Sequence, residues 1–337
     1  MKQKIVVIGA GVIGLTTALK IQKEFGEDID VTIYTADKSP NTTGDVSAGL
    51  WTPYLLQDTP EDKIIKWAKE TQDLFWLLWK NGYASDAGIS LQPMIYLWCD
   101  TTSLPKWSKI AIGCNEIKGK ELERFQNDQK IPYTGGFTFN SFICEPKKFL
   151  PFLENIFINN GGEIKIKKIE NFSQLKNYDV IVNCTGIYSK ILMKDERVKA
   201  IRGQILRVEA SWQFHTIMDN SDDGCYIIPN ENCVILGGTH QLDDEDTKPR
   251  IDDASRILKG CKQMVPSLHE AKILRHQVGL RPGRDQIRLE LSSTNIGNKS
   301  VPLIHNYGHG GSGITLCYGC ASEAVDLVKI ALTKSKL

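Results

Sequence analysis

The sequence has no long apolar run, no excess of charge of either sign and no low-complexity segment. Because no apolar stretch is long enough to span a bilayer, we do not expect a membrane protein. With 41 Lys and Arg against 40 Asp and Glu, the formal charge is +1, which does not favour a nucleic-acid or membrane partner. The 337 residues suffice for one large domain or two intermediate ones with well-buried cores.

The nine cysteines also lack a recognisable framework. Their number is odd, and most lie in apolar or strand-like surroundings, which is typical of reduced, intracellular thiols. Cys317 and Cys320 have the C-x-x-C spacing of a metal or redox site, but neither a second such pair nor a His pair accompanies them. We therefore predict no metal site.

A glycine-rich turn follows the first apolar run of the chain. The run Ile-Val-Val-Ile at residues 5–8 leads into a G-x-G-x-x-G pattern at residues 9–14. In such a turn Gly9 permits the sharp bend, Gly11 lets a pyrophosphate approach the backbone, and Gly14 lets the next helix pack on the strand. The free N–H groups at the start of that helix attract phosphate. The pattern predicts a dinucleotide site made by Gly9, Ala10, Gly11, Val12, Ile13 and Gly14.

The residues that follow support a βαβ unit. An amphipathic helix leads to Gly26, and residues 31–34 are a second β-branched strand with Asp37 after it, near the place where a ribose hydroxyl needs an acceptor. Asp37 could equally be a solvated turn residue. A signal peptide is the alternative for the whole segment, but Lys20 and Lys23 continue the helix and no small-residue cleavage site interrupts it.

The rest of the chain alternates between two patterns. Helices are predicted over residues 60–80, 145–160 and 314–332, and strands over 164–167 and 179–184 return to the nucleotide-binding sheet. Residues 201–280 favour antiparallel strands, including a hairpin from 226–228 to 234–236. A second glycine-rich turn at residues 308–313 opens the last helix and again has an anion-binding sequence.

Seven segments together resemble the D-amino-acid oxidase and D-aspartate oxidase family. They are residues 9–14, TTGDVSAGLWTPY at 42–54, VNCTG at 182–186, RGQ at 202–204, GGT at 237–239, VGLRP at 278–282 and HNYGHGGSG at 305–313. The residues alone do not separate FAD from NAD; the resemblance implies FAD. It also implies an α/β fold with a FAD-binding, Rossmann-like parallel sheet interleaved with a mostly antiparallel substrate domain. The FAD-binding domain is then expected at residues 1–50, 142–195 and 286–337, and the substrate domain at 51–141 and 196–285.

The resemblance implies which residues contact the cofactor. Besides the first glycine turn, they lie near the adenosine, along the path to the flavin, beside the adenine and in the second glycine turn. They are Asp37, Lys38, Thr42, Thr43, Ala48, Gly49, Leu50, Ile169, Thr185, Gly310, Gly311, Ser312, Gly313, Ile314 and Thr315.

The substrate carboxylate needs a cationic partner, because burying an unpaired anion is costly. Arg281 and Tyr226 stand at the family positions for this role, and a guanidinium can meet a carboxylate with two parallel hydrogen bonds. The neighbouring Arg284 and Arg288 are expected to be solvated or structural. The resemblance further places Tyr54, Asp222, His240 and Gly311 at the substrate.

The reaction implied is oxidative deamination of a D-amino acid to a 2-oxo acid, ammonia and hydrogen peroxide. The cofactor carries the redox chemistry, and no side-chain base is implied. His305 and His309 are expected to have structural or flavin-contacting roles. Relatives specific for acidic substrates carry extra cationic groups where this chain has Met218 and His240, and Asp222 would repel an acidic side chain if it points inward. A solvated lid charge is the alternative for Asp222. We expect neutral or basic substrates, with D-aspartate oxidase or a glycine- or sarcosine-type amine oxidase as alternatives; a nicotinamide dehydrogenase and a non-catalytic flavoprotein also stay open.

The last three residues, Ser335, Lys336 and Leu337, match a peroxisomal address. A peroxide-producing oxidase suits that compartment. The expected partners are a D-amino acid, O2 and the peroxisomal import receptor, with a homodimer left open.

Overall fold

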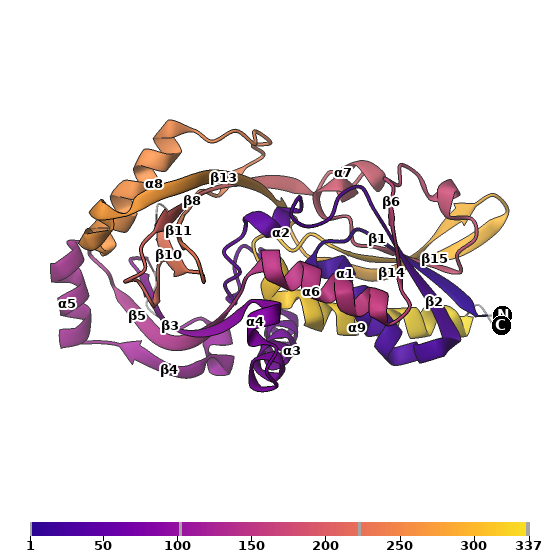
Figure 1. Cartoon of the computed structure of the whole chain (residues 1–337), viewed down its shortest axis with the longest axis horizontal. Helices are drawn as coiled ribbons and strands as arrows, with labels where there is room; N and C mark the ends of the chain where they lie inside the picture. Colours follow the sequence, from indigo (N-terminus) through magenta and orange to yellow (C-terminus); the bar gives the residue numbers. More distant parts are fainter. Residues whose placement is uncertain (1, 101–102, 222–223, 335–337) are drawn as a thin grey trace. The chain divides into compact units, whose positions relative to one another are not determined.

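A computed structural model of the chain describes residues 2–100, 103–221 and 224–334 (Figure 1). The chain divides into two compact units: residues 1–89, 144–200 and 281–337 contribute to unit 1, and residues 90–143 and 201–280 to unit 2. It crosses from one unit to the other within the strands β3 (Ile89–Trp98), β5 (Gly135–Cys144), β8 (Lys199–Glu209) and β13 (Lys272–Gly283). Each unit is therefore assembled from segments that are distant in sequence.

Unit 1 contains a parallel-rich sheet with the strand order β14-β15-β7-β1-β2-β6. Strands β1, β2, β6, β7 and β15 pair in parallel, and β14 pairs with β15 as an antiparallel hairpin. All four residues of the run 5–8 in β1 are buried, as expected for a parallel strand covered on both faces. The strands are β1 (Gln3–Ile8), β2 (Ile29–Thr35), β6 (Glu163–Ile166), β7 (Val180–Asn183), β14 (Arg288–Ile296) and β15 (Lys299–Tyr307).

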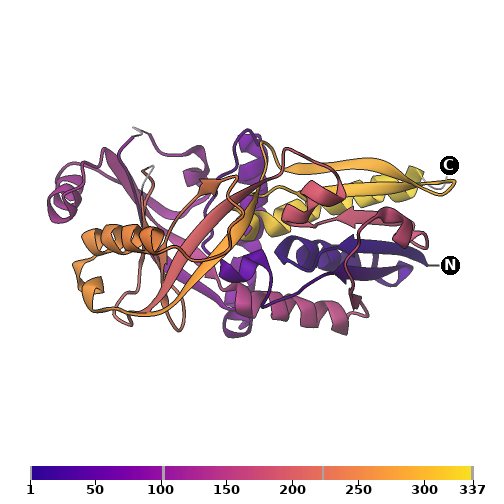
Figure 2. The same ribbon diagram turned by 90° about the horizontal axis from the view of Figure 1, so that it is seen from above.

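Four long helices belong to unit 1. Helix α1 contacts α6 and α9, and α9 in turn contacts α3 and runs beside the β14–β15 hairpin (Figure 2). Gly319 of α9 permits the approach of α3, because a Cβ there would lie 2.2 Å from the Trp67 Cα. The long helices are α1 (Val12–Phe25), α3 (Glu61–Lys80), α6 (Pro146–Asn159) and α9 (Gly313–Lys334), and the short ones are α2 (Thr43–Val46), α4 (Ala84–Ala87) and α7 (Ser189–Leu192).

Unit 2 is built on a mostly antiparallel sheet with the order β12-β8-β11-β10-β9-β3-β5-β4, and β13 also pairs with β8. Its core forms where Ala254, Ile257 and Cys261 of helix α8 pack on apolar residues of β8, β10 and β11. The hairpin predicted at residues 226–236 is confirmed by the antiparallel pairing of β10 and β11. The other elements are β4 (Ile112–Ile117), α5 (Lys120–Gln129), β9 (Thr216–Asp219), β10 (Tyr226–Pro229), β11 (Val234–Gly237), β12 (Gln241–Leu242) and α8 (Ile251–Met264).

The α/β fold class predicted from the sequence, a parallel-rich sheet with a mostly antiparallel second sheet, is confirmed. The compact units differ from the expected domains mainly at residues 51–89, which were expected in the substrate domain and lie in unit 1. The reason is tertiary: Trp67 and Thr71 of α3 pack on α9, and Thr71 Oγ1 accepts hydrogen bonds from the N–H groups of Tyr318 and Gly319 at 3.1 and 3.3 Å. Residues 281–285 lie in unit 1 for a similar reason, since the carbonyl of Pro282 accepts a hydrogen bond from Gly310 N–H at 2.9 Å.

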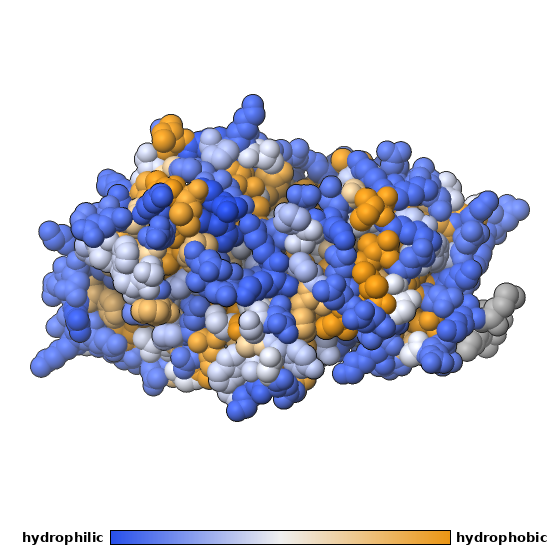
Figure 3. All heavy atoms as spheres, viewed as in Figure 1, coloured by the Kyte–Doolittle hydropathy of each residue, from blue (hydrophilic) through white to orange (hydrophobic). Residues whose placement is uncertain are grey.

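Within the part of the chain that the structure describes, no helix is both long and apolar enough to span a membrane, and no group of three or more His, Cys, Asp or Glu side chains could hold a metal. Cys317 and Cys320 are buried free thiols in α9, and burial raises the pKa of both. On the face shown in Figure 3, hydrophilic side chains cover most of the surface and enclose smaller apolar areas.

Candidate functional site: two glycine turns and their surroundings

The turn between β1 and α1 uses its three glycines differently. A Cβ on Gly14 would lie 1.9 Å from the Gly9 carbonyl oxygen, and one on Gly9 would lie 2.5 Å from the Cys184 carbonyl oxygen. These two glycines are therefore required by the packing of the turn itself. Gly11 differs, because a Cβ there would meet no described atom within 4 Å and its φ of −74° suits any residue. Open space at Gly11 is what the close approach of a pyrophosphate requires.

The second glycine turn lies next to the first. A Cβ on Gly313, the first residue of α9, would lie 3.7 Å from Val12 Cγ1, so the N-terminal ends of α1 and α9 are neighbours. The first turn of α1 contains no acidic residue that would compete with a phosphate. The residues present therefore fit an extended dinucleotide that starts at the first glycine turn and passes the second.

The end of β2 supports the first turn, and the side chains of Thr35 and Lys38 there have partners within the protein. Thr35 Oγ1 accepts a hydrogen bond from the Ala10 N–H at 3.3 Å. Asp37 is exposed, and Lys38 Nζ lies 2.5 Å from Glu154 Oε1 on α6. The adenosine roles of Asp37 and Lys38 stay predictions, and for Lys38 the ion pair already engages the amine.

Thr42 and Thr43 lie at the start of the short helix α2. Thr42 donates from its N–H and its hydroxyl to Asp45 Oδ2, at 2.9 and 2.7 Å, and Ser39 donates to Asp45 Oδ1 at 2.6 Å. Asp45 is buried, so these hydrogen bonds satisfy its carboxylate. The Thr42 hydroxyl is thus engaged in holding the loop, while Thr43 is exposed.

The loop at residues 48–54 is fastened to the second glycine turn by two hydroxyl groups. Tyr54 N–H donates to Ser312 Oγ at 2.7 Å, and Ser312 Oγ donates to the Tyr54 carbonyl at 2.7 Å. Thr52 N–H donates to Thr315 Oγ1 at 3.2 Å, and Thr315 Oγ1 donates to the Thr52 carbonyl at 3.0 Å. The structure thus gives the side chains of Ser312 and Thr315 a positioning role, and leaves backbone N–H groups of this turn, including those of Gly313 and Ile314, as the candidates for cofactor contact.

The loop itself is packed tightly beside β5. A Cβ on Gly49, whose φ is +79°, would lie 2.0 Å from the Cys144 carbonyl oxygen, and the Cys144 N–H donates to the Gly49 carbonyl at 2.8 Å. Ala48 and Leu50 on either side are half-buried. Their cofactor contacts stay predictions.

Ile169 and Thr185, both predicted beside the adenine, have different surroundings. The Ile169 side chain belongs to the core cluster with Val6 and Ile8 of β1, and its contact with the adenine stays a prediction. Thr185 follows β7 and donates from its hydroxyl to Asn183 Oδ1 at 2.8 Å, with Ser189 Oγ 2.7 Å away.

Three predicted substrate residues come together in unit 1. The Gly310 N–H bonds to the Pro282 carbonyl, next to Arg281 at the end of β13, and a Cβ on Gly311 would lie 2.5 Å from Tyr54 Cδ1. Burial raises the pKa of the Tyr54 phenol, and the nearby positive charge of Arg281 opposes this shift. Arg281, Tyr54 and Gly311 therefore share one neighbourhood.

In unit 2, Tyr226 lies at the start of β10, where it is the register partner of Met218 on β9 and Gly237 on β11. Its ring lies against bare backbone: a Cβ on Gly237 would lie 2.1 Å from Tyr226 Cζ, and one on Gly238 would lie 2.6 Å from the phenol oxygen. Sequence reasoning missed this role of the two glycines, although GGT was among the family segments. His240 is exposed, Met218 is buried, and Asp222 lies outside the described residues. The joint role of Tyr226 and Arg281 stays a prediction.

Two buried histidines, His305 in β15 and His309 in the second turn, have lowered pKa values and are neutral near pH 7. Burial lowers the pKa of His309 to about 3, and burial together with Arg288 lowers the pKa of His305 to about 4. Among the described residues, the buried atoms His309 Nε2 and Thr52 Oγ1 have no hydrogen-bond partner. Such buried polar groups normally have one. They are candidates to meet polar atoms of the cofactor.

A buried ion cluster supports the second turn. Arg284 Nε donates to Asp195 Oδ2 at 3.1 Å, Tyr307 donates to the same oxygen at 2.9 Å, and a Cβ on Gly308 would lie 2.9 Å from Arg284 Cβ. Arg284 is therefore structural. Burial alone would raise the pKa of Asp195, but the hydrogen bonds from Tyr307 and Arg284 and the Arg284 charge lower it.

We expect Asp195→Asn to lower the free energy of unfolding at pH 7 by about 2 kcal/mol, since it removes charged hydrogen bonds. The folded-state pKa of Asp195 is depressed, so its contribution is fully present above the unfolded value of about 3.9 and is lost as pH falls below it. Urea unfolding at pH 7 and pH 3 measures this, with the exposed neighbour variant Glu196→Gln as control. An equal difference at both pH values would contradict the expectation.

Comparisons with known proteins agree with this geometry. A family model described as FAD dependent oxidoreductase matches residues 4–327. The chain is 37% identical to a D-amino acid oxidase of Dugesia ryukyuensis, over 99% of each chain. It is 36% identical to a D-aspartate oxidase of Homo sapiens, over 96% of this chain and 94% of the relative. The structure of a glycine oxidase from Geobacillus kaustophilus superposes with a TM-score of 0.79 at 15% identity, covering 98% of this chain and 95% of that one, which concerns the fold alone.

Proposed function

We propose that this chain, which belongs to the family of FAD-dependent oxidoreductases that includes D-amino-acid and D-aspartate oxidases, oxidises D-amino acids to 2-oxo acids. The observation that carries the proposal is the neighbourhood of Arg281, Tyr54 and Gly311 beside the second glycine turn. A guanidinium next to a half-buried phenol suits an α-carboxylate.

FAD, when bound, supplies the two-electron oxidation and the return of the electrons to O2. The balanced reaction is D-amino acid, O2 and water to 2-oxo acid, ammonia and hydrogen peroxide. Of the chain's own residues, Arg281 is proposed to hold the substrate carboxylate, and a hydrogen bond from Tyr226 to the same group stays a prediction. His305 and His309, whose pKa values burial lowers to about 4 and about 3, are themselves uncharged near pH 7.

The test is the spectrum and the stereochemistry of turnover. We expect the purified protein to be yellow with bound FAD and to release peroxide from D- but not L-alanine. A protein that cannot be reconstituted with FAD, or one that oxidises both enantiomers equally, would refute the proposal. Sarcosine and glycine in the same assay separate it from a glycine- or sarcosine-type amine oxidase.

For the side chain of the substrate we propose that neutral or basic groups are preferred. Met218 is buried and carries no charge, and His240 is exposed, so neither supports a fixed buried cation for an acidic side chain. D-Aspartate oxidation is the second candidate, favoured by the 36% identity to the human D-aspartate oxidase.

We expect kcat/KM to be higher for D-alanine and D-lysine than for D-aspartate. If Asp222 points toward the substrate, Asp222→Asn is expected to reduce the difference in kcat/KM between D-alanine and D-aspartate, because like charges about 4 Å apart cost roughly 4 kcal/mol at an effective dielectric near 20. If Asp222 is a solvated lid charge, the substitution leaves this difference unchanged. Steady-state kinetics on the three substrates measure this, and Asp223→Asn is the matched control. A parent enzyme that already prefers D-aspartate would refute the proposed preference for neutral or basic side chains. The proposal that the chain oxidises D-amino acids would still stand.

We further propose peroxisomal localisation through the last three residues, Ser335 to Leu337, which lie outside the described residues. The support is the match to the address itself and the peroxide expected as a product. An N-terminal fluorescent fusion in cells is expected to enter peroxisomes, and a Leu337→Ala fusion to stay outside. Equal distribution of both fusions would contradict the proposal.

A further inference from the structure

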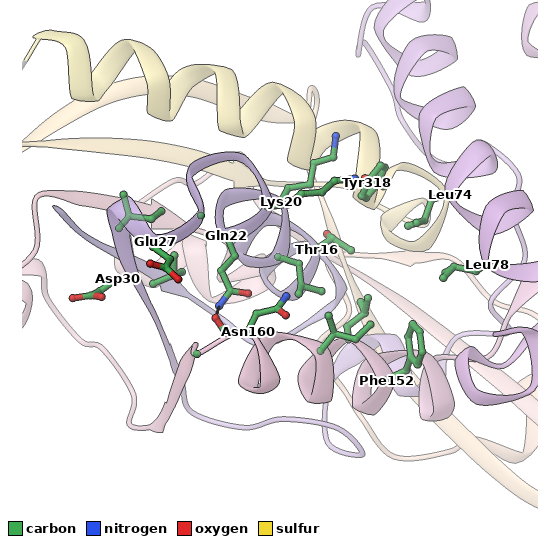
Figure 4. Close-up of a pocket in the computed structure, with 18 of the residues that line it drawn as sticks. Thr16, Lys20, Gln22, Glu27, Asp30, Leu74, Leu78, Phe152, Asn160 and Tyr318 are labelled. Atoms are coloured by element: carbon green, nitrogen blue, oxygen red, sulfur yellow. Dashed lines mark hydrogen bonds between the residues drawn. The ribbon is translucent and has the colours of Figure 1, made fainter. Parts of the chain in front are cut away.

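Unit 1 contains a cleft whose lining includes no residue of either glycine turn (Figure 4). It has a volume of about 560 Å3 and is lined by side chains of α1, α3, α6 and α9 together with the start of β2. It borders the C-terminal half of α1, whereas the dinucleotide is expected at the N-terminal end of that helix. Clefts of roughly 300–1,000 Å3 accommodate small molecules.

One end of the cleft is apolar. Leu74 and Leu78 lie one helical turn apart on α3, and Phe152 and Ile156 face the cleft from α6 (Figure 4). This end suits a hydrocarbon chain or an aromatic ring, whose burial is favourable at roughly 25 cal/mol per Å2.

The other end of the cleft carries polar groups, one of which is a buried acceptor without a hydrogen-bond donor among the described residues. Gln22 Nε2 donates to the Phe157 and Asn160 carbonyls, at 3.2 and 3.4 Å, which fixes the orientation of the amide. Gln22 Oε1 is then turned away from these carbonyls, and although buried it accepts no hydrogen bond from any residue that the structure describes. A buried acceptor without a donor costs about 1–3 kcal/mol. A ligand with an O–H or N–H group would satisfy it.

The charges around the cleft do not favour an ion. Lys2 and Asp30 form a pair at 3.9 Å, and Lys23 and Glu27 contribute one charge of each sign to the lining. The Lys20 amine is directed to α9, where it donates to Ser322 Oγ at 2.5 Å (Figure 4).

The Lys20 amine also lies 4.2 Å from the centre of the Tyr318 ring, so it already has two partners within the protein.

We propose that this cleft binds an uncharged amphipathic molecule, whose apolar part lies between α3 and α6 and whose hydroxyl or amide N–H donates to Gln22 Oε1. Such a site is separate from the oxidase chemistry and does not depend on it.

Calorimetric titration of the holoenzyme tests the ligand class. Decan-1-ol is expected to bind with a stoichiometry of one, and 1-methoxydecane, which has the same chain but no donor, about tenfold more weakly. In Gln22→Met the two ligands are expected to bind equally. Absence of saturable decanol binding, or equal affinities for the two ligands in the parent, would overturn the proposal.

Two tryptophan variants test the location. Leu78→Trp fills the apolar end and is expected to weaken decanol binding at least tenfold. Leu77→Trp is the matched control, because Leu77 is the preceding residue of α3, is 56% exposed and does not line the cleft. Unchanged decanol binding in Leu78→Trp would overturn the proposed location. Should Leu78→Trp not fold, the ratio of alcohol to ether affinity in the parent and in Gln22→Met decides.

Discussion

Arg281→Leu is expected to lower kcat/KM for D-alanine at least a hundredfold while the protein keeps its flavin absorption. Removal of one partner from a buried charged pair costs about 3–5 kcal/mol, and every 1.4 kcal/mol is a factor of ten. Arg281 lies in the neighbourhood of Tyr54 and Gly311, and none of the predicted pyrophosphate contacts involves it. Substrate binding and turnover should therefore fail without loss of FAD.

Two further variants separate the chemistry of Arg281 from its charge. Arg281→Lys keeps the charge but loses the planar pair of donors, so an intermediate loss is expected. Arg275→Leu, at an exposed position of the same strand β13, should change kcat/KM by less than twofold. A normal KM in Arg281→Leu would place the carboxylate elsewhere and remove the main support for the proposed substrate class.

Gly11→Val is expected to weaken FAD binding by a hundredfold or more and to leave the apoprotein folded. The open space at Gly11, with no described atom within 4 Å of a Cβ, lets the apoprotein accept the side chain. Gly11 is the N-cap of α1, and an apolar residue in place of glycine at an N-cap lowers the free energy of unfolding by about 1 kcal/mol. The same side chain would occupy the space into which the pyrophosphate comes, so the FAD affinity falls although the fold does not.

Flavin fluorescence quenching gives the FAD affinity, and urea unfolding of the apoprotein gives its stability. Gly14→Ala is the contrasting variant: its Cβ would lie 1.9 Å from the Gly9 carbonyl oxygen, so it should destabilise the apoprotein itself. If Gly11→Val bound FAD as tightly as the parent, the predicted position of the pyrophosphate would be wrong.

The first βαβ unit could be predicted because its signal is local. A run of buried β-branched residues, a glycine turn and an amphipathic helix follow one another within residues 5–25, so each element constrains the next. The hairpin of β10 and β11 was predictable for the same reason, since its turn lies between the paired strands.

Other features depend on contacts between distant segments, and sequence gives no signal for them. Ser312 and Thr315 have the residue types of cofactor-binding hydroxyls, but their oxygens bond to the backbone of residues 52 and 54. The family resemblance led us to expect residues 51–89 in the substrate domain, and no signal within α3 itself indicates that it packs on α9. The packing of the Tyr226 ring against Gly237 and Gly238 likewise depends on the pairing of β10 with β11, and the residues next to Tyr226 do not indicate this packing.

The order in which the chain is synthesised gives the α1–α9 contact a further meaning. Helix α1 is complete by residue 25, but the helix that covers one of its sides begins only at residue 313. A nascent chain therefore carries α1 with that side uncovered while all of unit 2 is translated. Since α9 and its glycine turn follow every segment of unit 2 in the sequence, the cofactor-binding end of unit 1 is completed only after residues 308–334 have been translated. Residues 90–143 and 201–280 emerge earlier, so unit 2 has all of its own segments available before unit 1 does.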